Sequence, residues 1–93
     1  MPKLTVFYLE HCPYCHSARR AAEALKSEDG RYGEIELDWI EESRAPERTR
    51  GYDYYYVPSI FLDHEKLYEC SPAHGDAEIL ANVRSAFDRA LGD

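Results

Sequence analysis

The sequence predicts an α/β fold in which a four-stranded mixed sheet is flanked by three helices, in the order β-α-β-α-β-β-α. Two observations carry this prediction. An apolar strand-like segment runs directly into a helical pattern and then into a second strand, which requires a parallel crossover. Later in the chain, two short strand-like segments read as an antiparallel hairpin before a final amphipathic helix. A mixed sheet with helices on both faces satisfies both requirements.

The first strand and helix have the clearest local signals. Residues 4–9 are β-branched, aromatic or apolar on both faces, as in a buried central strand. A helix then begins at Pro13, because proline is favoured at the first helical position, where its missing N–H is no loss. This helix is expected to end before Gly30. Its apolar face is formed by Ala18, Ala21, Ala22 and Leu25.

The rest of the chain supplies the remaining elements. Residues 34–39 alternate strictly between polar and apolar, which predicts a half-buried strand at an edge of the sheet. Residues 43–50 predict a short polar helix, and residues 59–62 and 66–69 predict the hairpin. The apolar positions within 79–91 fall on one helical stripe, so the last helix packs one face on the sheet.

Size and charge exclude several classes of protein. The chain has 93 residues, 44% hydrophobic and 31% charged, so we expect one globular domain over residues 1–93. Its formal net charge of −7 argues against a nucleic-acid partner, which would require a basic surface. No apolar run approaches the roughly 18 residues of a membrane span, and the N-terminus lacks the layout of a signal peptide. We therefore expect a cytoplasmic monomer that binds neither nucleic acid nor membrane.

The three cysteines direct attention to redox chemistry. An odd count does not fit the disulfide framework of a small secreted protein, so a reducing compartment is expected. Cys12 lies at the start of the first helix, where unpaired N–H groups and the helix dipole favour an anion such as a thiolate. Cys15 lies one turn deeper. Such a pair attacks a substrate disulfide with the outer sulfur and resolves the mixed disulfide with the inner one.

Two other interpretations of the cysteines were considered. Cys12 to His16 matches the C-x-x-C-H pattern of covalent haem attachment, but that chemistry needs export, and the only methionine available as a second axial ligand is Met1. A tetrahedral zinc site formed by Cys12, Cys15, Cys70 and His74 is permitted by the spacing. A non-catalytic zinc-binding or interaction module therefore stays open as the alternative from another class. For Cys70 itself, a buried and inert thiol is the simplest interpretation.

The active-site unit resembles a known family. Residues 4–25, with the core Cys12-Pro13-Tyr14-Cys15, resemble the dithiol glutaredoxins of the CPYC type, members of the thioredoxin-like superfamily. Tyr56-Val57-Pro58 resembles the Thr-Val-Pro segment of that family. The resemblance implies a thioredoxin-like fold and a cis Val57–Pro58 bond that faces the cysteines. It also implies that the backbone of Val57 pairs with the substrate like an added strand.

A third segment of the family's pattern is only partly present. Glutaredoxins carry Gly-Gly-x-Asp before the last helix to hold the γ-glutamyl end of glutathione, and Gly75 and Asp76 match part of it. Asp76 also fits the role of N-cap for the last helix, and both roles stay open. The family's lysine three residues before the first cysteine is replaced by Leu9. The resemblance thus implies the catalytic pair Cys12 and Cys15, with a substrate or glutathione site formed by Tyr14, Val57, Pro58, Gly75 and Asp76.

The resemblance also implies which partners to expect. The enzyme would be a thiol–disulfide oxidoreductase, with no metal and no tightly bound cofactor, and with glutathione as co-substrate. Its substrates would be disulfide-containing or glutathionylated proteins. Its reductant would be glutathione or, in the alternative of a glutathione-independent redoxin, a thioredoxin reductase.

Overall fold

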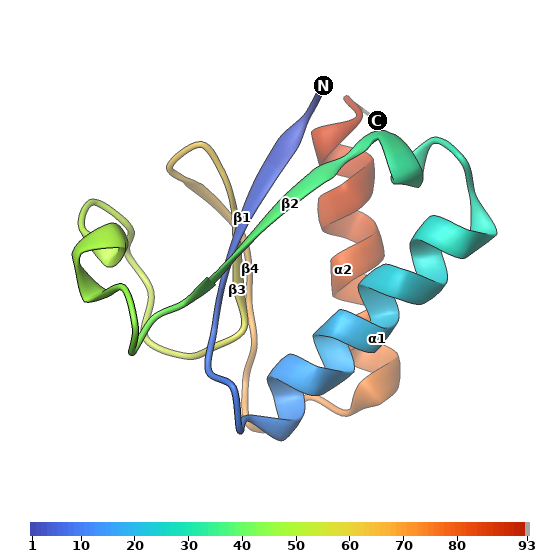
Figure 1. The fold of residues 1–93 in the computed structure, drawn as a ribbon. Helices are drawn as coiled ribbons and strands as arrows, with labels where there is room; N and C mark the ends of the chain where they lie inside the picture. Colours follow the sequence, from blue (N-terminus) through green and yellow to red (C-terminus); the bar gives the residue numbers. More distant parts are fainter. Residues whose placement is uncertain (93) are drawn as a thin grey trace.

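A computed structural model of the chain describes residues 1–92 and forms one mixed sheet with two α-helices (Figure 1). Two short 3-10 helices connect these elements. In chain order the elements are β1 (Lys3–Tyr8), α1 (Pro13–Glu28), a 3-10 helix (Tyr32–Glu34), β2 (Glu36–Glu41), a second 3-10 helix (Pro46–Thr49), β3 (Ser59–Leu62), β4 (Glu65–Glu69) and α2 (Asp76–Ala90).

The sheet has the strand order β2-β1-β3-β4. β1 pairs in parallel with β2 and antiparallel with β3, and β3 pairs antiparallel with β4. The predicted mixed four-stranded sheet is therefore confirmed, with β1 at its centre and β2 at an edge. Because β1 is central, the segment that follows it emerges in the middle of one end of the sheet, and this is where the cysteine pair lies.

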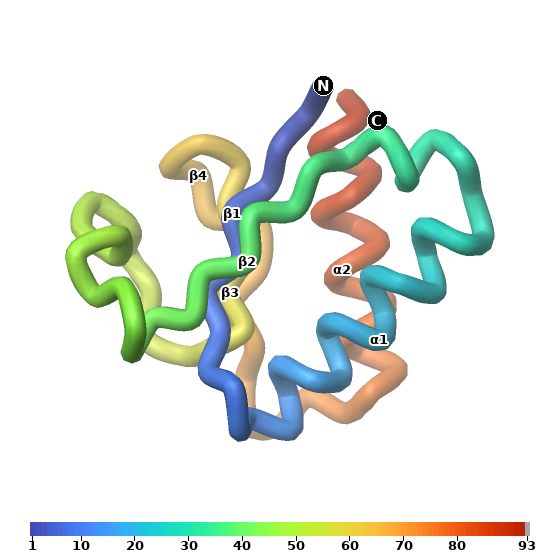
Figure 2. Tube along the Cα trace, in the orientation of Figure 1, coloured from blue at the N-terminus to red at the C-terminus, as the bar shows by residue number. Residues whose placement is uncertain are grey.

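The two faces of the sheet are covered differently. Both α-helices lie side by side on one face, while the segment between β2 and β3 covers the other (Figures 1 and 2). The helical face holds the larger core, built around Leu4 and Val6 of β1. On the opposite face Phe7 stacks on Tyr54 with ring centroids 4.8 Å apart, and Phe61 completes a small aromatic cluster.

The helix α1 forms where the sequence predicts it. It begins at Pro13 and ends at Glu28, where the N–H of Asp29 donates to the carbonyl of Leu25. The predicted apolar face is buried, and Cys15 and Ser17 are buried with it. The first turn of this helix is therefore fixed to the sheet by the same packing that buries Cys15.

Two connecting segments differ from the prediction. The second strand starts at Glu36 rather than at residue 34, because residues 32–34 form a 3-10 turn closed by a hydrogen bond from the N–H of Ile35 to the carbonyl of Tyr32. The helix expected over 43–50 is reduced to a 3-10 helix of four residues. There the carboxylate of Glu41 accepts the N–H and the hydroxyl of Ser43, and this side-chain turn competes with a helical start.

The helix α2 is the last element of the chain, and the apolar face predicted for it is buried in the core. Ile79, Val83 and Phe87 are among its buried residues. Its N-cap is Gly75, whose N–H donates to the side chain of Glu78 at 2.8 Å, so the expectation that Asp76 is the N-cap is wrong. Among residues 1–92, no helix is long and apolar enough to cross a membrane.

Candidate active site

Cys12 is the N-cap of α1 and lies at the end of the sheet where β1 stops. Its backbone is extended, and its Sγ accepts the N–H of Cys15 at 3.3 Å. The Sγ atom thereby occupies the place of an N-cap oxygen, beside the first turn of the helix and the positive end of the helix dipole. A thiolate at this atom is stabilised by the helix that follows it. Cys12 is also partly exposed, so a substrate sulfur has access to it.

Cys15 lies one turn into the helix and is only 2% exposed. Burial is the main reason that the pKa of its thiol is raised well above the ordinary value, and the nearby charge of Cys12 raises it further. The inner thiol therefore stays protonated and is shielded from solvent, whereas the Sγ of Cys12 is accessible. This asymmetry matches the predicted division of roles between the two cysteines.

The loop before β3 brings the second predicted motif to the first. The Val57–Pro58 peptide bond is cis, as the resemblance to glutaredoxins implies, and Pro58 is buried. The carbonyl oxygen of Val57 lies 3.9 Å from the Sγ of Cys12, although the two residues are 45 positions apart. The carbonyl of Pro58 accepts the N–H of Cys70 at 3.0 Å, which fixes this turn against the end of β4.

Glu69 holds this loop, and sequence reasoning missed it. One carboxylate oxygen accepts the N–H groups of Tyr55 and Tyr56 at 2.8 and 2.7 Å, and the other accepts the Lys66 ammonium at 2.7 Å. The bond with Lys66 is the largest cause that lowers the pKa of Glu69 to about 2, and the Tyr56 N–H adds to it. The sequence shows Lys66 and Glu69 three positions apart, which indicates an ion pair. It does not indicate that Glu69 contacts the loop before β3.

The remaining predicted residues lie beside the cysteine helix rather than at the sulfur. The hydroxyl of Tyr14 donates to the carbonyl of Pro72 at 3.1 Å, so it connects the motif to the loop before α2. Asp76 is the first residue of α2, and its Oδ1 accepts the hydroxyl of Ser17 at 2.6 Å. Gly75 and Asp76 are thus placed next to the second turn of α1, and neither forms a hydrogen bond with Cys12.

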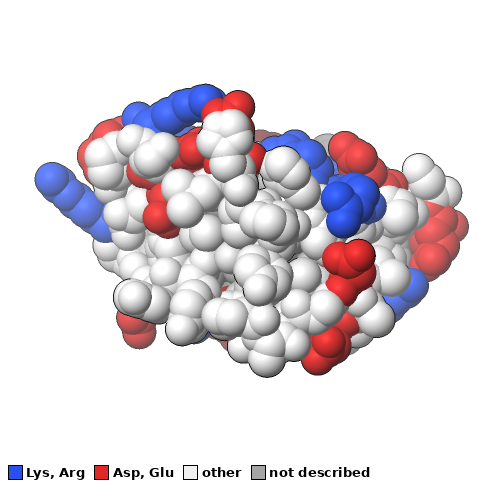
Figure 3. Space-filling model, turned by 90° about the horizontal axis from the view of Figure 1, so that it is seen from below, with Lys and Arg blue, Asp and Glu red and all other residues white. Residues whose placement is uncertain are grey.

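The two carboxylates nearest to Cys12 are both engaged by other groups of the protein. Leu9 and Cys12 line a hollow of about 340 Å³ together with two carboxylates, Glu10 and Glu41. Glu10 pairs with Arg44, and Glu41 accepts the N–H of Glu10 at 3.1 Å. Seen from this end, the middle of the surface carries no Lys, Arg, Asp or Glu side chains, which lie towards its margins (Figure 3).

The zinc site that the spacing permits is not assembled. Nδ1 of His74 lies 2.8 Å from the hydroxyl of Tyr68, and the two rings stack. Within residues 1–92, no group of three or more histidine, cysteine or acidic side chains is arranged to hold a metal ion. Cys70 is buried, as predicted, and burial raises the pKa of its thiol.

Comparison with known proteins places the chain in a family. The family model for glutaredoxin matches residues 4–67. A solved structure described as that of a malarial protein superposes with a TM-score of 0.58 at 14% identity, covering 88% of this chain and 92% of the other, which supports the thioredoxin-like fold. No curated protein matches the sequence significantly. The glutaredoxin family model spans more than half of the chain and includes the cysteine pair and the cis-proline loop. This protein therefore belongs to the glutaredoxin family of thiol–disulfide oxidoreductases.

Proposed function

We propose that this protein reduces protein disulfides and glutathione mixed disulfides through Cys12 and Cys15, with glutathione as the reductant. The observation that carries the proposal is the inequivalence of the two sulfurs. The Sγ of Cys12 is partly exposed at a helix N-terminus, and Cys15 is buried one turn below it. A dithiol with one accessible thiolate and one protected thiol fits nucleophilic attack followed by resolution.

In the first step the Cys12 thiolate attacks one sulfur of a substrate disulfide. A new S–S bond forms between Cys12 and that sulfur, and the other substrate sulfur leaves as a thiolate. The Val57 carbonyl beside Cys12 lies where the backbone of an extended substrate can pair with the loop. This pairing needs no particular substrate side chain.

In the second step Cys15 attacks the Sγ of Cys12. The Cys12–Cys15 disulfide forms, the second substrate sulfur leaves as a thiolate, and the two electrons of the dithiol have passed to the substrate. Cys12 no longer carries a charge in the mixed disulfide, so one of the causes that raise the pKa of Cys15 is removed at this point. Loss of the Cys15 proton thus becomes easier when its thiolate is required.

Two glutathione molecules then return the protein disulfide to the dithiol and become glutathione disulfide. The loss of the family's lysine at Leu9 removes one cationic contact, and two arginines of the neighbouring segment, Arg44 and Arg48, are paired with Glu10 and Asp38. We therefore expect glutathione to bind mainly through backbone groups, at Val57 and at the first turn of α2, and to turn over slowly. These lost contacts favour a thioredoxin reductase as the second candidate reductant.

Matched cysteine variants test the assignment. Cys12→Ser should abolish the reduction of every disulfide. Cys15→Ser should stop dithiol reduction of proteins and should retain deglutathionylation, which needs only the outer sulfur and free glutathione. Cys70→Ser is the control, because it removes a buried thiol that the mechanism does not use. Full activity of Cys12→Ser would contradict the proposal.

A coupled assay distinguishes the two reductants. The oxidised protein is offered either glutathione with glutathione reductase or thioredoxin reductase alone, and consumption of NADPH is followed. Faster consumption in the glutathione arm supports the proposal. Efficient consumption in the thioredoxin reductase arm alone would assign the protein to the glutathione-independent redoxins.

A further inference from the structure

Arg19, on the side of α1 that faces β2, has a guanidinium that contacts two aromatic rings. Its Cζ lies 4.2 Å from the ring centroid of Trp39 and 5.3 Å from that of Tyr8. Within residues 1–92, the Arg19 guanidinium forms no hydrogen bond or ion pair with a carboxylate or carbonyl. The cation–π contacts with both rings hold the guanidinium in the groove and leave its N–H donors without a carboxylate partner, which suits bidentate binding of a ligand carboxylate.

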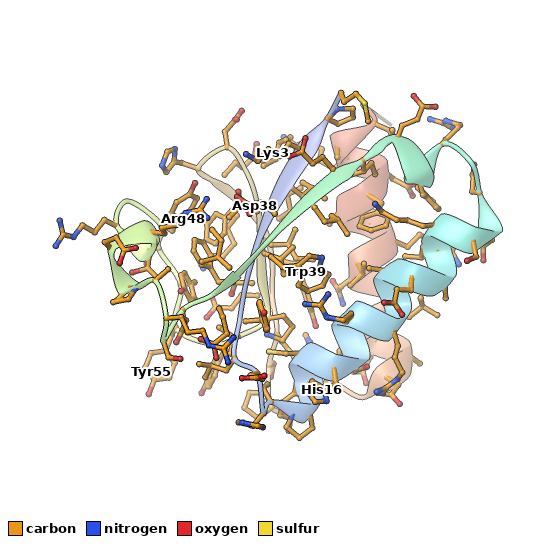
Figure 4. All side chains as sticks on the ribbon, in the orientation of Figure 1. Lys3, His16, Asp38, Trp39, Arg48 and Tyr55 are labelled. Atoms are coloured by element: carbon orange, nitrogen blue, oxygen red, sulfur yellow. The ribbon has the colours of Figure 1, made fainter. Side chains whose placement is uncertain are left out.

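The guanidinium lies where two hollows adjoin between α1 and the sheet edge. One hollow, of about 440 Å³, runs from Tyr8 and Cys15 to Arg19. The other, of about 230 Å³, continues from Arg19 to Leu37 and Trp39 on β2. Trp39 reaches from β2 towards α1 and lines the second hollow (Figure 4). Together they form a groove, here called the α1–β2 groove, that leads from the neighbourhood of the active-site cysteines to the edge of the sheet.

The edge strand presents free backbone groups to this groove. The N–H groups of Glu36 and Glu42 donate to carbonyls of the β1 strand and the residue before it. Because successive residues of a strand point their backbone groups to opposite sides, the N–H and C=O groups of Leu37 and Trp39 point away from β1. In many proteins, charged side chains on an edge strand prevent pairing with another chain. Here the carboxylate of Asp38 pairs with Arg48 on the opposite face of the sheet, so it does not block the groove.

The charges of the groove favour an acidic ligand. Glu10 is paired with Arg44, and the Arg20 guanidinium lies 3.8 Å from the carboxylate of Asp76. These two pairs cancel. The charged side chains of the groove outside these pairs are Arg19, Lys26 and Glu23. Their sum is positive, on a chain whose formal net charge is −7.

We propose that the α1–β2 groove docks an extended acidic segment of the protein whose disulfide is reduced, with a carboxylate of that segment on Arg19 and its backbone along β2. The inference rests on the proposed function, because the groove starts beside Cys15, one helical turn from Cys12. Arg19 lies seven positions after Cys12 along the helix, a rise of about 10 Å, which an extended chain covers in about three residues. Preferred substrates therefore carry Asp or Glu about three residues from the reactive cysteine.

A binding experiment that needs no redox activity tests the groove. Trp39 is the only tryptophan of the chain, so its fluorescence reports on the ring that Arg19 covers. The reduced protein is titrated with a short, extended, cysteine-free peptide that carries one Glu, and with the same peptide carrying Gln. The Glu peptide should change the fluorescence saturably and should bind about fivefold more tightly than the Gln peptide at low salt, with the difference shrinking as salt is added.

Three variants make the test specific to the guanidinium. Arg19→Gln should remove the preference for the Glu peptide. Arg19→Lys, which keeps the charge and loses the planar fork, should retain part of it. Arg89→Gln is the matched control, since it removes the same charge from the exposed end of α2, where Arg89 pairs with Glu65, and it should leave the preference unchanged. Thermal unfolding of each variant verifies that it is folded.

A kinetic arm separates this inference from the proposed function. Two peptide disulfides, with Glu or Gln three residues from the cysteine, are reduced by the wild type and by Arg19→Gln. A kcat/KM about fivefold higher for the Glu substrate, lost in Arg19→Gln, supports the docking site. Equal rates for both substrates, with no fluorescence preference, overturn it while leaving the proposed function intact. If neither substrate is reduced, the proposed function is contradicted, and the fluorescence titration still shows whether the groove prefers the Glu peptide.

A dimer formed through β2 in the absence of peptide would also overturn the proposal, because a second copy would then cover the edge.

Discussion

The hydroxyl of Ser17 donates a 2.6 Å hydrogen bond to Oδ1 of Asp76 and joins the second turn of α1 to the first residue of α2. Ser17 is 6% exposed, whereas the side chain of Asp76 is 81% exposed. One oxygen of Asp76 is thus engaged in holding the two helices together. Its other oxygen is the one left for a ligand such as the ammonium of a γ-glutamyl group.

Variants of this pair separate its structural role from ligand binding. Ser17→Ala should lower the free energy of unfolding by about 1 kcal/mol, since it removes a hydrogen bond to a charged but largely exposed acceptor. Asp76→Ala should do the same and should also raise KM for a glutathionylated peptide. Denaturant unfolding and steady-state kinetics measure the two effects. A KM that is unchanged in Asp76→Ala, or raised equally in Ser17→Ala, would mean that Asp76 has no direct contact with glutathione.

The two active-site thiols should differ in their rates of alkylation. At pH about 8.5, where an ordinary cysteine thiol is about half ionised, Cys12 should react quickly with iodoacetamide. Cys15 should remain largely unmodified, because burial raises its pKa and restricts access. Mass spectrometry of the digested protein gives the rate at each site, with Cys70 as a second buried thiol for comparison. Alkylation of Cys15 as fast as that of Cys12 would contradict the proposed division of roles.

Acid should weaken the loop that Glu69 holds. The pKa of Glu69 is lowered from 4.5 to about 2, so its carboxylate stabilises the folded state above pH 4.5, and this contribution is lost as the pH falls from 4.5 towards 2. The free energy of unfolding should therefore be higher for the wild type than for Glu69→Gln at neutral pH. The difference should disappear near pH 2. A difference that stays constant across this range would show that Glu69 is not the titrating group.

The same variant should also affect catalysis. Without the Glu69 carboxylate, the N–H groups of Tyr55 and Tyr56 lose a charged acceptor, and the loop that presents Val57 to Cys12 is held less firmly. We expect a higher KM for protein disulfides in Glu69→Gln. Lys66→Gln is the control, because it removes the ion pair of Glu69 and leaves both loop hydrogen bonds in place.

Restoring a cation beside Cys12 should improve the use of glutathione. Leu9 lines the hollow next to Cys12, and the carboxylates nearby are already engaged with the protein. Leu9→Lys should lower the apparent KM for a glutathionylated substrate by about fivefold, through a new contact with a glutathione carboxylate. Leu9→Gln, which is polar but uncharged, should not. An equal improvement in both variants would indicate that the loss of leucine, rather than the gained charge, is responsible.

Much of this site could be predicted from short stretches of sequence. Pro13 and the periodicity after it locate the start of α1 and its buried face, and these two features leave Cys12 partly exposed and Cys15 buried. The connection over 43–50 could not be predicted in the same way. Its composition suits a helix, but the Glu41 carboxylate accepts the N–H of Ser43, and the resulting side-chain turn replaces the start of a helix. The expected N-cap role of Asp76 failed for a similar reason, since Gly75 is held by Glu78 and Asp76 by Ser17.

Local chemistry therefore places the nucleophile, because a helix start, a buried face and a thiol one turn apart all lie within a few residues of one another. The partners that surround it are chosen by packing across the fold. The bonds of Glu69 to the loop before Val57, of Asp76 to Ser17, and the stacking of Arg19 on Trp39 each join distant parts of the chain. No periodicity or spacing encodes such contacts, since they form only where the crossover and the hairpin bring separate strands and helices together.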